Sequence, residues 1–162
     1  MSTPVLDCSA LRRAFGAFPT GVVAVAALGD NGPVGLAASS FTSVSLEPAI
    51  VSVNIASTSK TLPALRKHRH WGISVLAEHQ GWIGRQLSQE PDTRFVDVRW
   101  RTNDRGGVVL EDAAAHFSVR VDTFVRAGDH DIVLLHVEDL HLDVSSSPLV
   151  FHASKFRQLR TP

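Results

Sequence analysis

This chain of 162 residues lacks three features: a second cysteine, a net charge and a long apolar run. Cys8 is the only cysteine, so no disulfide can form within the chain. Lysine plus arginine and aspartate plus glutamate both number 16. The formal net charge is therefore zero, whereas a general nucleic-acid binder needs a basic surplus to displace counterions. No run approaches the ~18 apolar residues of a membrane-spanning helix, so we expect neither nucleic acid nor membrane as a partner.

The sequence also lacks several short patterns that mark particular classes of protein. The start Met-Ser-Thr-Pro-Val-Leu-Asp has no basic region followed by an apolar one, so we expect no signal peptide and a cytoplasmic protein. There is no Gly-x-Gly-x-x-Gly, which argues against a Rossmann dinucleotide site, and no Gly-x-Ser-x-Gly nucleophile elbow. His68 and His70 lie close in sequence, but two imidazoles without further ligands do not make a zinc site, and we expect no metal.

What the chain does have is a stretch rich in hydroxyl groups, from Gly35 to Val53. Between Ala37 and Ser45 it lacks the strict apolar and polar alternation of a half-buried strand. Small residues followed by adjacent serines suggest a backbone that a flat ligand can approach closely, with hydroxyls for its polar edge. The composition alone equally fits a serine-rich turn between two strands.

The remaining pattern predicts many short strands and few short helices. We expect a first helix capped by Ser9 and ended by Pro19, with Leu11, Ala14, Phe15 and Phe18 on one face. Further helices are expected over 57–68 and 78–87, and 88–105 is expected to be irregular. Strands are expected over 22–28, from 34 onward, and over 49–55, 71–76, 108–110, 114–125, 131–142 and 148–151. Residues 29–33 carry dense turn chemistry and should close a hairpin.

The predicted strands do not alternate with helices, so the βαβ units of a parallel sheet are not expected. The pattern predicts a mainly β protein and favours an antiparallel barrel. The length suits one domain over 1–162, with a core of about 11–159, that buries roughly two thirds of its unfolded surface.

Several segments, in the same order along the chain, resemble those of the short-chain flavin reductases, the reductase partners of two-component flavin monooxygenases. They run from the opening helix and strand (12–25) through the hydroxyl-rich stretch, 51–65 and 71–76 to Arg94-Phe95 and Gly128-Asp-His130. Ser39 and Ser74 stand where the family pattern often has Asn, and Ala49 replaces a Pro. The resemblance covers nearly the whole chain.

The resemblance implies a six-stranded antiparallel Greek-key split barrel with a few short flanking helices, working as a homodimer. It places one set of residues against a flavin ring, FMN or FAD: Ala37, Ala38, Ser39, Ser40, Phe41, Ser43 and Val44. A second set would hold the ribityl phosphate: Thr58, Ser59, Lys60, Arg94 and Phe95. A helix starting near Ser59 would support that set by directing free N–H groups at an anion, although an N-cap with an incidental Lys explains the same residues.

The resemblance further implies that Gly128, Asp129 and His130 contact NADH or NADPH. We therefore expect an NAD(P)H-dependent flavin reductase that supplies reduced flavin to a separate monooxygenase and needs no catalytic acid, base or nucleophile of its own. A carrier or sensor that only stores flavin is the alternative, and it has no use for a nicotinamide contact. A split-barrel oxidase acting on a vitamin B6 phosphate would want more Arg and Lys near Ser39 and Ser45.

Overall fold

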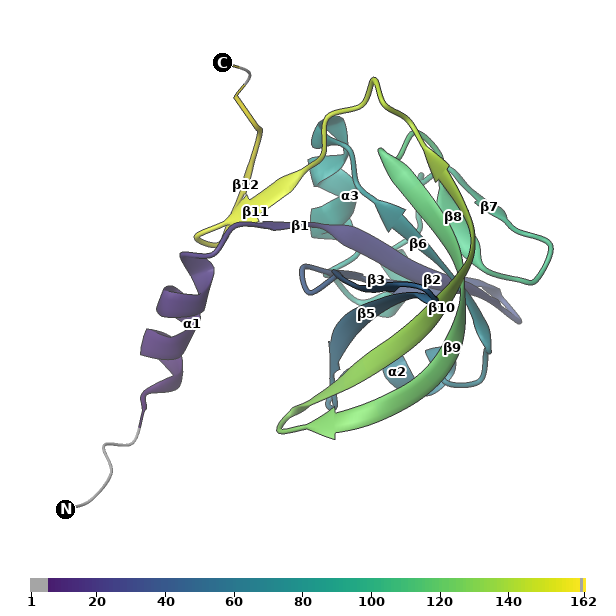
Figure 1. Cartoon of the computed structure of the whole chain (residues 1–162), viewed down its shortest axis with the longest axis horizontal. Helices are drawn as coiled ribbons and strands as arrows, with labels where there is room; N and C mark the ends of the chain where they lie inside the picture. The colour runs from purple at the N-terminus through teal and green to yellow at the C-terminus, as the bar shows by residue number, and fades with distance from the viewer. Residues whose placement is uncertain (1–5, 161) are drawn as a thin grey trace.

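A computed structural model describes residues 6–160 and 162 (Figure 1). The expected domain 1–162 therefore includes residues 1–5 and 161, which lie outside the described residues. Strands dominate, and the helices are short. The first half of the chain forms α1 (Cys8–Gly16), β1 (Thr20–Gly21), β2 (Val23–Gly29), β3 (Gly32–Ala38), β4 (Thr42–Leu46), β5 (Ala49–Ala56), α2 (Leu62–Leu65) and β6 (His70–Val75). The second half forms η1 (Glu78–Gln80), α3 (Gly81–Gln86), η2 (Pro91–Thr93), β7 (Trp100–Thr102), β8 (Val108–Leu110), β9 (Ala115–Ala127), β10 (His130–Leu142), β11 (Val150–His152) and β12 (Lys155–Arg157).

The main sheet is antiparallel and has seven strands in the order β3-β2-β6-β9-β10-β5-β4. Two smaller sheets, β1-β11-β12 and β7-β8, accompany it. The expectation of a mainly β, antiparallel protein is confirmed. Six strands are not confirmed, and in the described part of the chain the edge strands β3 and β4 do not pair to close a barrel. Local sequence patterns do not show whether a sheet closes into a barrel, because closure depends on pairing between strands far apart in the chain.

Strand β2 explains why residues 22–28 read as one continuous apolar run. Val23, Val25 and Ala27 belong to one buried cluster, together with Trp71 and Leu135 among others. Residues 22 and 24 belong to a second cluster, which contains Leu76, Leu87, Leu110 and Leu149. Successive side chains of a strand point to opposite faces. The strand is therefore buried on both faces, and an apolar residue is favoured at every position.

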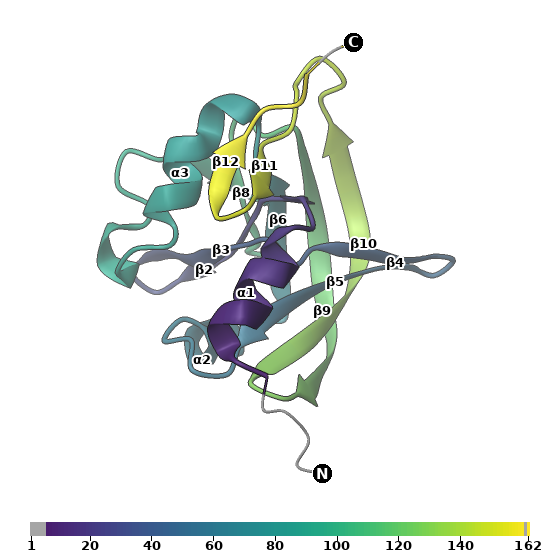
Figure 2. The same ribbon diagram turned by 90° about the vertical axis from the view of Figure 1, so that its left-hand side faces the viewer.

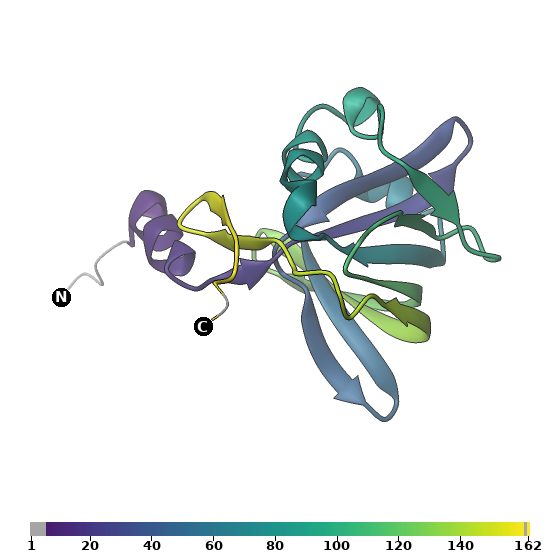
Figure 3. The same cartoon turned by 90° about the horizontal axis from the view of Figure 1, so that it is seen from above.

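Three helix predictions differ from the structure. Asp7, and not Ser9, caps α1, since its carboxylate accepts the Ser9 N–H at 3.2 Å. No residue of α1 is buried, and the helix stands apart from the main sheet (Figure 1, Figure 3), so its apolar face does not enter the core. The helix expected over 57–68 is a single turn, Leu62–Leu65, held by the indole N–H of Trp71, which donates to the carbonyls of Leu65 and His68.

The strand predictions fare better. The hairpin over residues 29–33 is confirmed, with Gly29 paired to Gly32 and Gly32 at a φ of 117°. The predicted strands over 49–55, 71–76 and 131–142 match β5, β6 and β10 to within one residue at each end. The irregular segment 88–105 contains η2 and the three-residue strand β7, too short for a period-two pattern to be read. The hydroxyl-rich stretch splits into the end of β3 and the whole of β4, and the β4–β5 hairpin projects from the sheet (Figure 2).

We predict that Gly72→Ala will destabilise the fold. A Cβ at Gly72 in β6 would overlap the backbone carbonyl of Val108 in β8, and neither backbone can withdraw without breaking its sheet. Overpacking of this kind costs about 1–3 kcal/mol, which corresponds to a fall of about 4–8 °C in the midpoint of thermal unfolding for a loss of 2 kcal/mol. Gly21→Ala is the matched control, since no atom lies within 4 Å of its Cβ position. Equal melting of both variants would contradict the close approach of β6 and β8.

Candidate active site

A cavity of about 820 Å³ opens where the end of β3 meets the 57–60 loop and the β9–β10 turn. Four parts of the chain line it, and one of them is α1, which stands off the main sheet (Figure 1). The lining residues of the strands, the loop and the turn are Leu36, Ala37, Ala38, Ser39, Ser40, Asn54, Ile55, Ala56, Ser59, Ala127, Asp129, His130 and Ile132. Helix α1 adds Cys8, Leu11, Arg12 and Phe15. A cavity of this size is typical of a small-molecule site.

The structure brings the first part of the predicted flavin segment to this cavity and leaves the second part away from it. Ala37 to Ser40 line it, while Phe41 stacks on Phe117 with ring centroids 5.7 Å apart and packs against the core. Ser43 and Val44 lie on the projecting strand β4 and do not line the cavity of a single chain. The hydroxyl of Ser40 has a structural task, because it accepts the N–H of Asn54 at 2.9 Å and donates to the Asn54 carbonyl.

The predicted phosphate residues surround the start of α2. The Ser59 hydroxyl accepts the N–H groups of Thr61 and Leu62 at 3.2 and 3.3 Å, so Ser59 caps the turn, and Thr58 is exposed beside it. Lys60 is exposed and lies 3.7 Å from the Glu90 carboxylate. Both side chains of this pair are nearly four-fifths exposed, so the ion pair contributes little to stability.

Arg94 is the best-anchored of the predicted phosphate residues. Its Nη1 donates to the Gly35 carbonyl at 2.8 Å and to the Thr61 hydroxyl at 2.7 Å, and its Nε donates to the Gln89 carbonyl at 2.8 Å. Partial burial lowers the pKa of the Arg94 guanidinium, and the Glu90 carboxylate acts in the opposite direction. Arg94 thereby ties β3 to the start of α2. Phe95, beside it, packs against the second core cluster and lines a different cavity.

The predicted nicotinamide residues form the tight turn between β9 and β10. Gly128 has a φ of 62°, and Asp129 follows it at the tip. The carbonyl of Asp129 accepts the N–H of Ser57 at 2.9 Å, which fixes this turn to the 57–60 loop. His130 Nδ1 donates to Asp129 Oδ1 at 2.7 Å. This hydrogen bond is the main cause of a lowered pKa for Asp129, and Arg12 acts in the same direction.

The chain is similar to known proteins over most of its length. A family model described as "Flavin reductase like domain" matches residues 15–160. A curated relative, the NADH:FMN oxidoreductase of Rhodococcus qingshengii, is 37% identical over 153 residues, which is 91% of this chain and 78% of that protein. The chain belongs to the flavin reductase like family.

Solved structures extend this family likeness to the fold. The NADH:FAD oxidoreductase SgcE6 of Streptomyces globisporus C-1027 superposes with a TM-score of 0.90 and 29% identity, over 99% of this chain and 100% of that one. The same protein has been solved in complex with NAD and FAD fragments. A nitrilotriacetate monooxygenase component B homologue from Mycobacterium thermoresistibile gives a TM-score of 0.88 at 28% identity, over 95% of this chain and 89% of that one.

Some cavity residues of this flavin reductase like chain were missed from the sequence. Arg12, Asn54 and Ile132 line the cavity, but none of them was assigned to a binding site from the sequence. Cys8, the first residue of α1, is exposed and also lines it. The one available signal was in α1: Leu11 and Phe15 form an apolar face, which lines the cavity instead of entering the core.

Sequence reasoning also missed the buried carboxylate next to His130. The side chain of Asp131 is only 3% exposed and accepts hydrogen bonds from Arg126 Nε at 2.8 Å and Arg66 Nη2 at 2.9 Å. Arg66 follows α2 and also stacks over the Phe124 ring at 3.9 Å. The hydrogen bond from Arg126 is the main cause of a lowered pKa for Asp131, and Arg66 adds to it. Asp131 thereby joins α2 to the β9–β10 hairpin directly beside the turn.

No helix in the described part of the chain is long and apolar enough to cross a membrane. Within residues 6–160 and 162 there is also no group of three or more His, Cys, Asp or Glu side chains arranged to hold a metal ion.

We predict that Asp131→Asn will destabilise the protein by about 2 kcal/mol at neutral pH, because hydrogen bonds to a charged group contribute about 1.5–3 kcal/mol. The folded pKa of Asp131 is lowered, so its contribution is complete above the unfolded pKa of about 3.9 and is lost as the pH falls through the folded value. The stability difference between wild type and variant should thus shrink below about pH 4. Urea unfolding at several pH values measures this.

Asp122→Asn provides the control for this prediction. Asp122 also lies on the hairpin and pairs with His136 at 3.4 Å, but its side chain is 46% exposed. The loss at this position should stay below about 1 kcal/mol. An Asp131→Asn variant no less stable than Asp122→Asn would show that the buried pairs do not hold the hairpin to α2.

Proposed function

We propose that this chain is an NAD(P)H-dependent flavin reductase that uses FMN or FAD, with NADH or NADPH as the reductant. One observation carries the proposal: the small-residue end of β3 and the His130 turn line the same cavity. The two segments that the resemblance assigns to flavin and to nicotinamide therefore face a common space. The names of relatives, which couple NADH to FMN or FAD, support the same activity.

The flavin ring fits the free edge of β3. In the described part of the chain β3 is an edge strand paired only with β2, and the Gly35 carbonyl on its free edge accepts from Arg94. The backbone groups of an antiparallel strand alternate between its two sides with a period of two. The N–H and C=O of Ala37 therefore lie on the same free edge, at the cavity. Ala37 and Ala38 are small enough to let a flat ring approach, and its pyrimidine edge can hydrogen-bond to these groups.

The phosphate of the flavin is proposed to lie at Thr58, Ser59 and Lys60. Because α2 is one turn long, its dipole adds less than a full helix would, and the Lys60 ammonium supplies most of the attraction. The ion pair between Lys60 and Glu90 is exposed and weak, so Lys60 can leave Glu90 and bind a phosphate instead. Arg94, with three hydrogen bonds inside the protein, is proposed to position Gly35 and Thr61 around that phosphate.

The flavin and nicotinamide rings, when bound, would supply the hydride-transfer chemistry themselves. The protein's part is to orient the two rings and exclude water from them. His130 Nδ1 is occupied by the hydrogen bond that it donates to Asp129, which leaves Nε2 as the ring nitrogen available to a ligand in the cavity. We propose that Gly128, Asp129 and His130 position the nicotinamide in this way.

We also propose a homodimer. Phe15 on α1 and Phe18 just after it are 71% and 74% exposed, and Leu46 at the tip of the β4–β5 hairpin is 94% exposed. Large exposed apolar side chains grouped on projecting elements are typical of an interface. Ser43 and Val44 lie on the same hairpin, so a partner chain could bring them to a flavin.

The domain, the location and the partner are part of the same proposal. We propose that residues 11–159 form one domain, that the protein works in the cytoplasm, and that reduced flavin diffuses to a separate flavin-dependent monooxygenase. The likeness to a monooxygenase component B homologue supports the last point.

We predict that His130→Ala will leave flavin binding unchanged and will raise the KM for NADH about three- to tenfold, the equivalent of one hydrogen bond. The measurement is flavin titration by fluorescence quenching alongside NADH oxidation kinetics. His79→Ala, an exposed histidine away from the cavity, should match the wild type. A fall confined to kcat would mean that His130 acts mainly in the transition state. A wild type that binds flavin but oxidises neither NADH nor NADPH would be a carrier and would contradict the proposed function.

We predict that sedimentation at micromolar concentration will give twice the chain mass of 17.5 kDa. Leu46→Asp should shift the protein to the monomer, since it places a charge at the proposed interface. Leu28→Asp adds the same charge at the β2–β3 end, where Leu28 is 40% exposed, and should remain dimeric. A monomeric wild type with full activity would rule the dimer out.

A further inference from the structure

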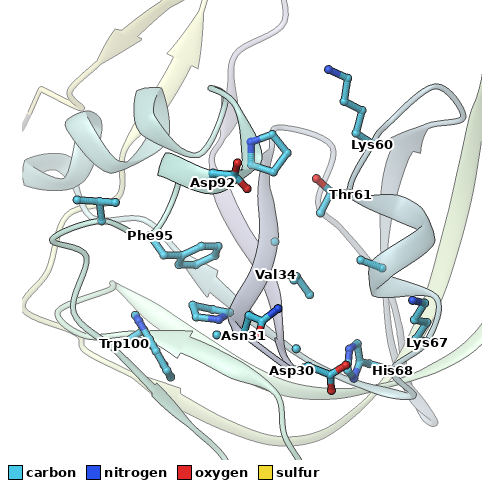
Figure 4. A pocket seen from close by; sticks show the side chains of 17 residues that line it. Asp30, Asn31, Val34, Lys60, Thr61, Lys67, His68, Asp92, Phe95 and Trp100 are labelled. Carbon is cyan, nitrogen blue, oxygen red and sulfur yellow. The ribbon is translucent and has the colours of Figure 1, made fainter.

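A second cavity of about 670 Å³ adjoins the first along β3 (Figure 4). The first half of β3, Gly32 to Gly35, lines the second cavity, and the second half lines the first. The 57–61 loop is divided in the same way, since Ser59 lines the first cavity while Lys60 and Thr61 line the second. The two cavities thus meet at the proposed phosphate position. From Pro33 to Ala37 the strand advances about 13 Å at its usual rise.

The second cavity has two aromatic side chains in its wall, Phe95 and Trp100 (Figure 4). Both are partly buried and pack against the second core cluster, which restrains their rings. Pro33 and Val34 provide further apolar surface from β3. Walls of this kind bind the faces of heteroaromatic rings, and stacking on an aromatic side chain is a main source of affinity for nucleobases.

The polar lining is mixed in charge. Lys60, Lys67 and His68 line the cavity together with Asp30 and Asp92, and Asn31 adds an amide. A pocket for a simple anion would have a clear basic excess. This lining instead suits a ligand that is anionic at one end, beside Lys60, and carries neutral hydrogen-bonding groups at the other, beside Asn31 and Asp30. An adenosine phosphate has that distribution: a phosphate, ribose hydroxyls and an amino group on the base.

We propose that this second cavity binds the adenosine phosphate half of a dinucleotide, and specifically that of FAD, so that the chain prefers FAD to FMN. This rests on the proposed function. The phosphate position at Ser59 and Lys60 joins the two cavities, and FAD continues from that phosphate into an adenosine phosphate whereas FMN ends there. NADH carries the same adenosine phosphate, so the experiment must measure the binding of FAD and of NADH separately.

The test is a titration of FMN and FAD with the full-length protein in the absence of NADH. Wild type should bind FAD at least fivefold more tightly than FMN, and AMP should compete with FAD but not with riboflavin. Trp100→Ala should remove the preference for FAD and leave the dissociation constant of FMN within twofold of wild type. Trp82→Ala, which changes a half-exposed tryptophan on α3 outside this cavity, is the control and should retain the preference.

A second variant keeps the test decisive if Trp100→Ala does not fold, which loss of FMN binding would reveal. Lys67→Glu changes an exposed residue at the cavity and should weaken FAD at least threefold more than FMN. Lys155→Glu makes the same charge change on exposed β12 and should affect both flavins equally. Equal affinity for the two flavins in wild type would overturn the assignment to FAD.

The remaining outcomes are also distinct. A rise in the KM for NADH in Trp100→Ala, with FMN as acceptor and no preference for FAD in wild type, would assign the cavity to the nicotinamide cofactor and overturn the FAD proposal. A wild type that binds and reduces FMN but whose FAD affinity is unaffected by either variant would overturn the inference and leave the proposed function intact. Binding of neither flavin would overturn the proposed function itself.

Discussion

The free edge of β3 is the constraint on which the rest of the site depends. In the described part of the chain this strand pairs on one side only, with β2, and its other side must find partners elsewhere. An unpaired strand edge invites association with another chain unless it is covered. Arg94 covers the first half by donating to the Gly35 carbonyl. The same nitrogen also donates to the Thr61 hydroxyl, at the start of α2. The second half, at Ala37, is left to the cavity, where a ligand can make the missing hydrogen bonds.

The elements that could be predicted from the sequence are those whose pattern is local. β5 and β10 alternate, β2 is apolar throughout, and the turn after β2 contains Gly and Asn, so all were found close to their observed positions. The misses depend on distant contacts. β7 exists because it pairs with β8, and the 57–68 helix stops after one turn. The Trp71 indole N–H donates to the carbonyls of Leu65, at the end of that turn, and of His68 beyond it, and no propensity of residues 57–68 indicates such bonds.

The residues of the site were likewise only partly predictable from the sequence. Ala37 to Ser40, Ser59 and the 129–130 turn come from segments about 20 and 70 residues apart, and the family resemblance placed them together where spacing alone could not. Asp131 was missed because a charged residue at the start of a strand usually faces solvent, although a period of two places it on the buried face with Val133 and Leu135. Only the fold shows that the Arg66 and Arg126 side chains meet over it and bury it. Arg12 and Phe15 reach the cavity from a helix whose position depends on the tertiary structure.

These contacts make the proposed flavin and nicotinamide segments parts of one rigid unit. The Ser57 N–H binds the Asp129 carbonyl, and two residues further along Asp131 holds Arg66 at the end of α2. Any shift of the His130 turn is thereby transmitted to the loop that carries Ser59 and Lys60. Two rings that exchange a hydride must approach within a narrow range of distance, and an error of about 1 Å can cost roughly 100-fold in rate. In the proposed reaction this distance would be the protein's main means of controlling the rate. A buried, doubly hydrogen-bonded carboxylate is a stronger brace for the turn than an exposed ion pair, because water and salt screen it less.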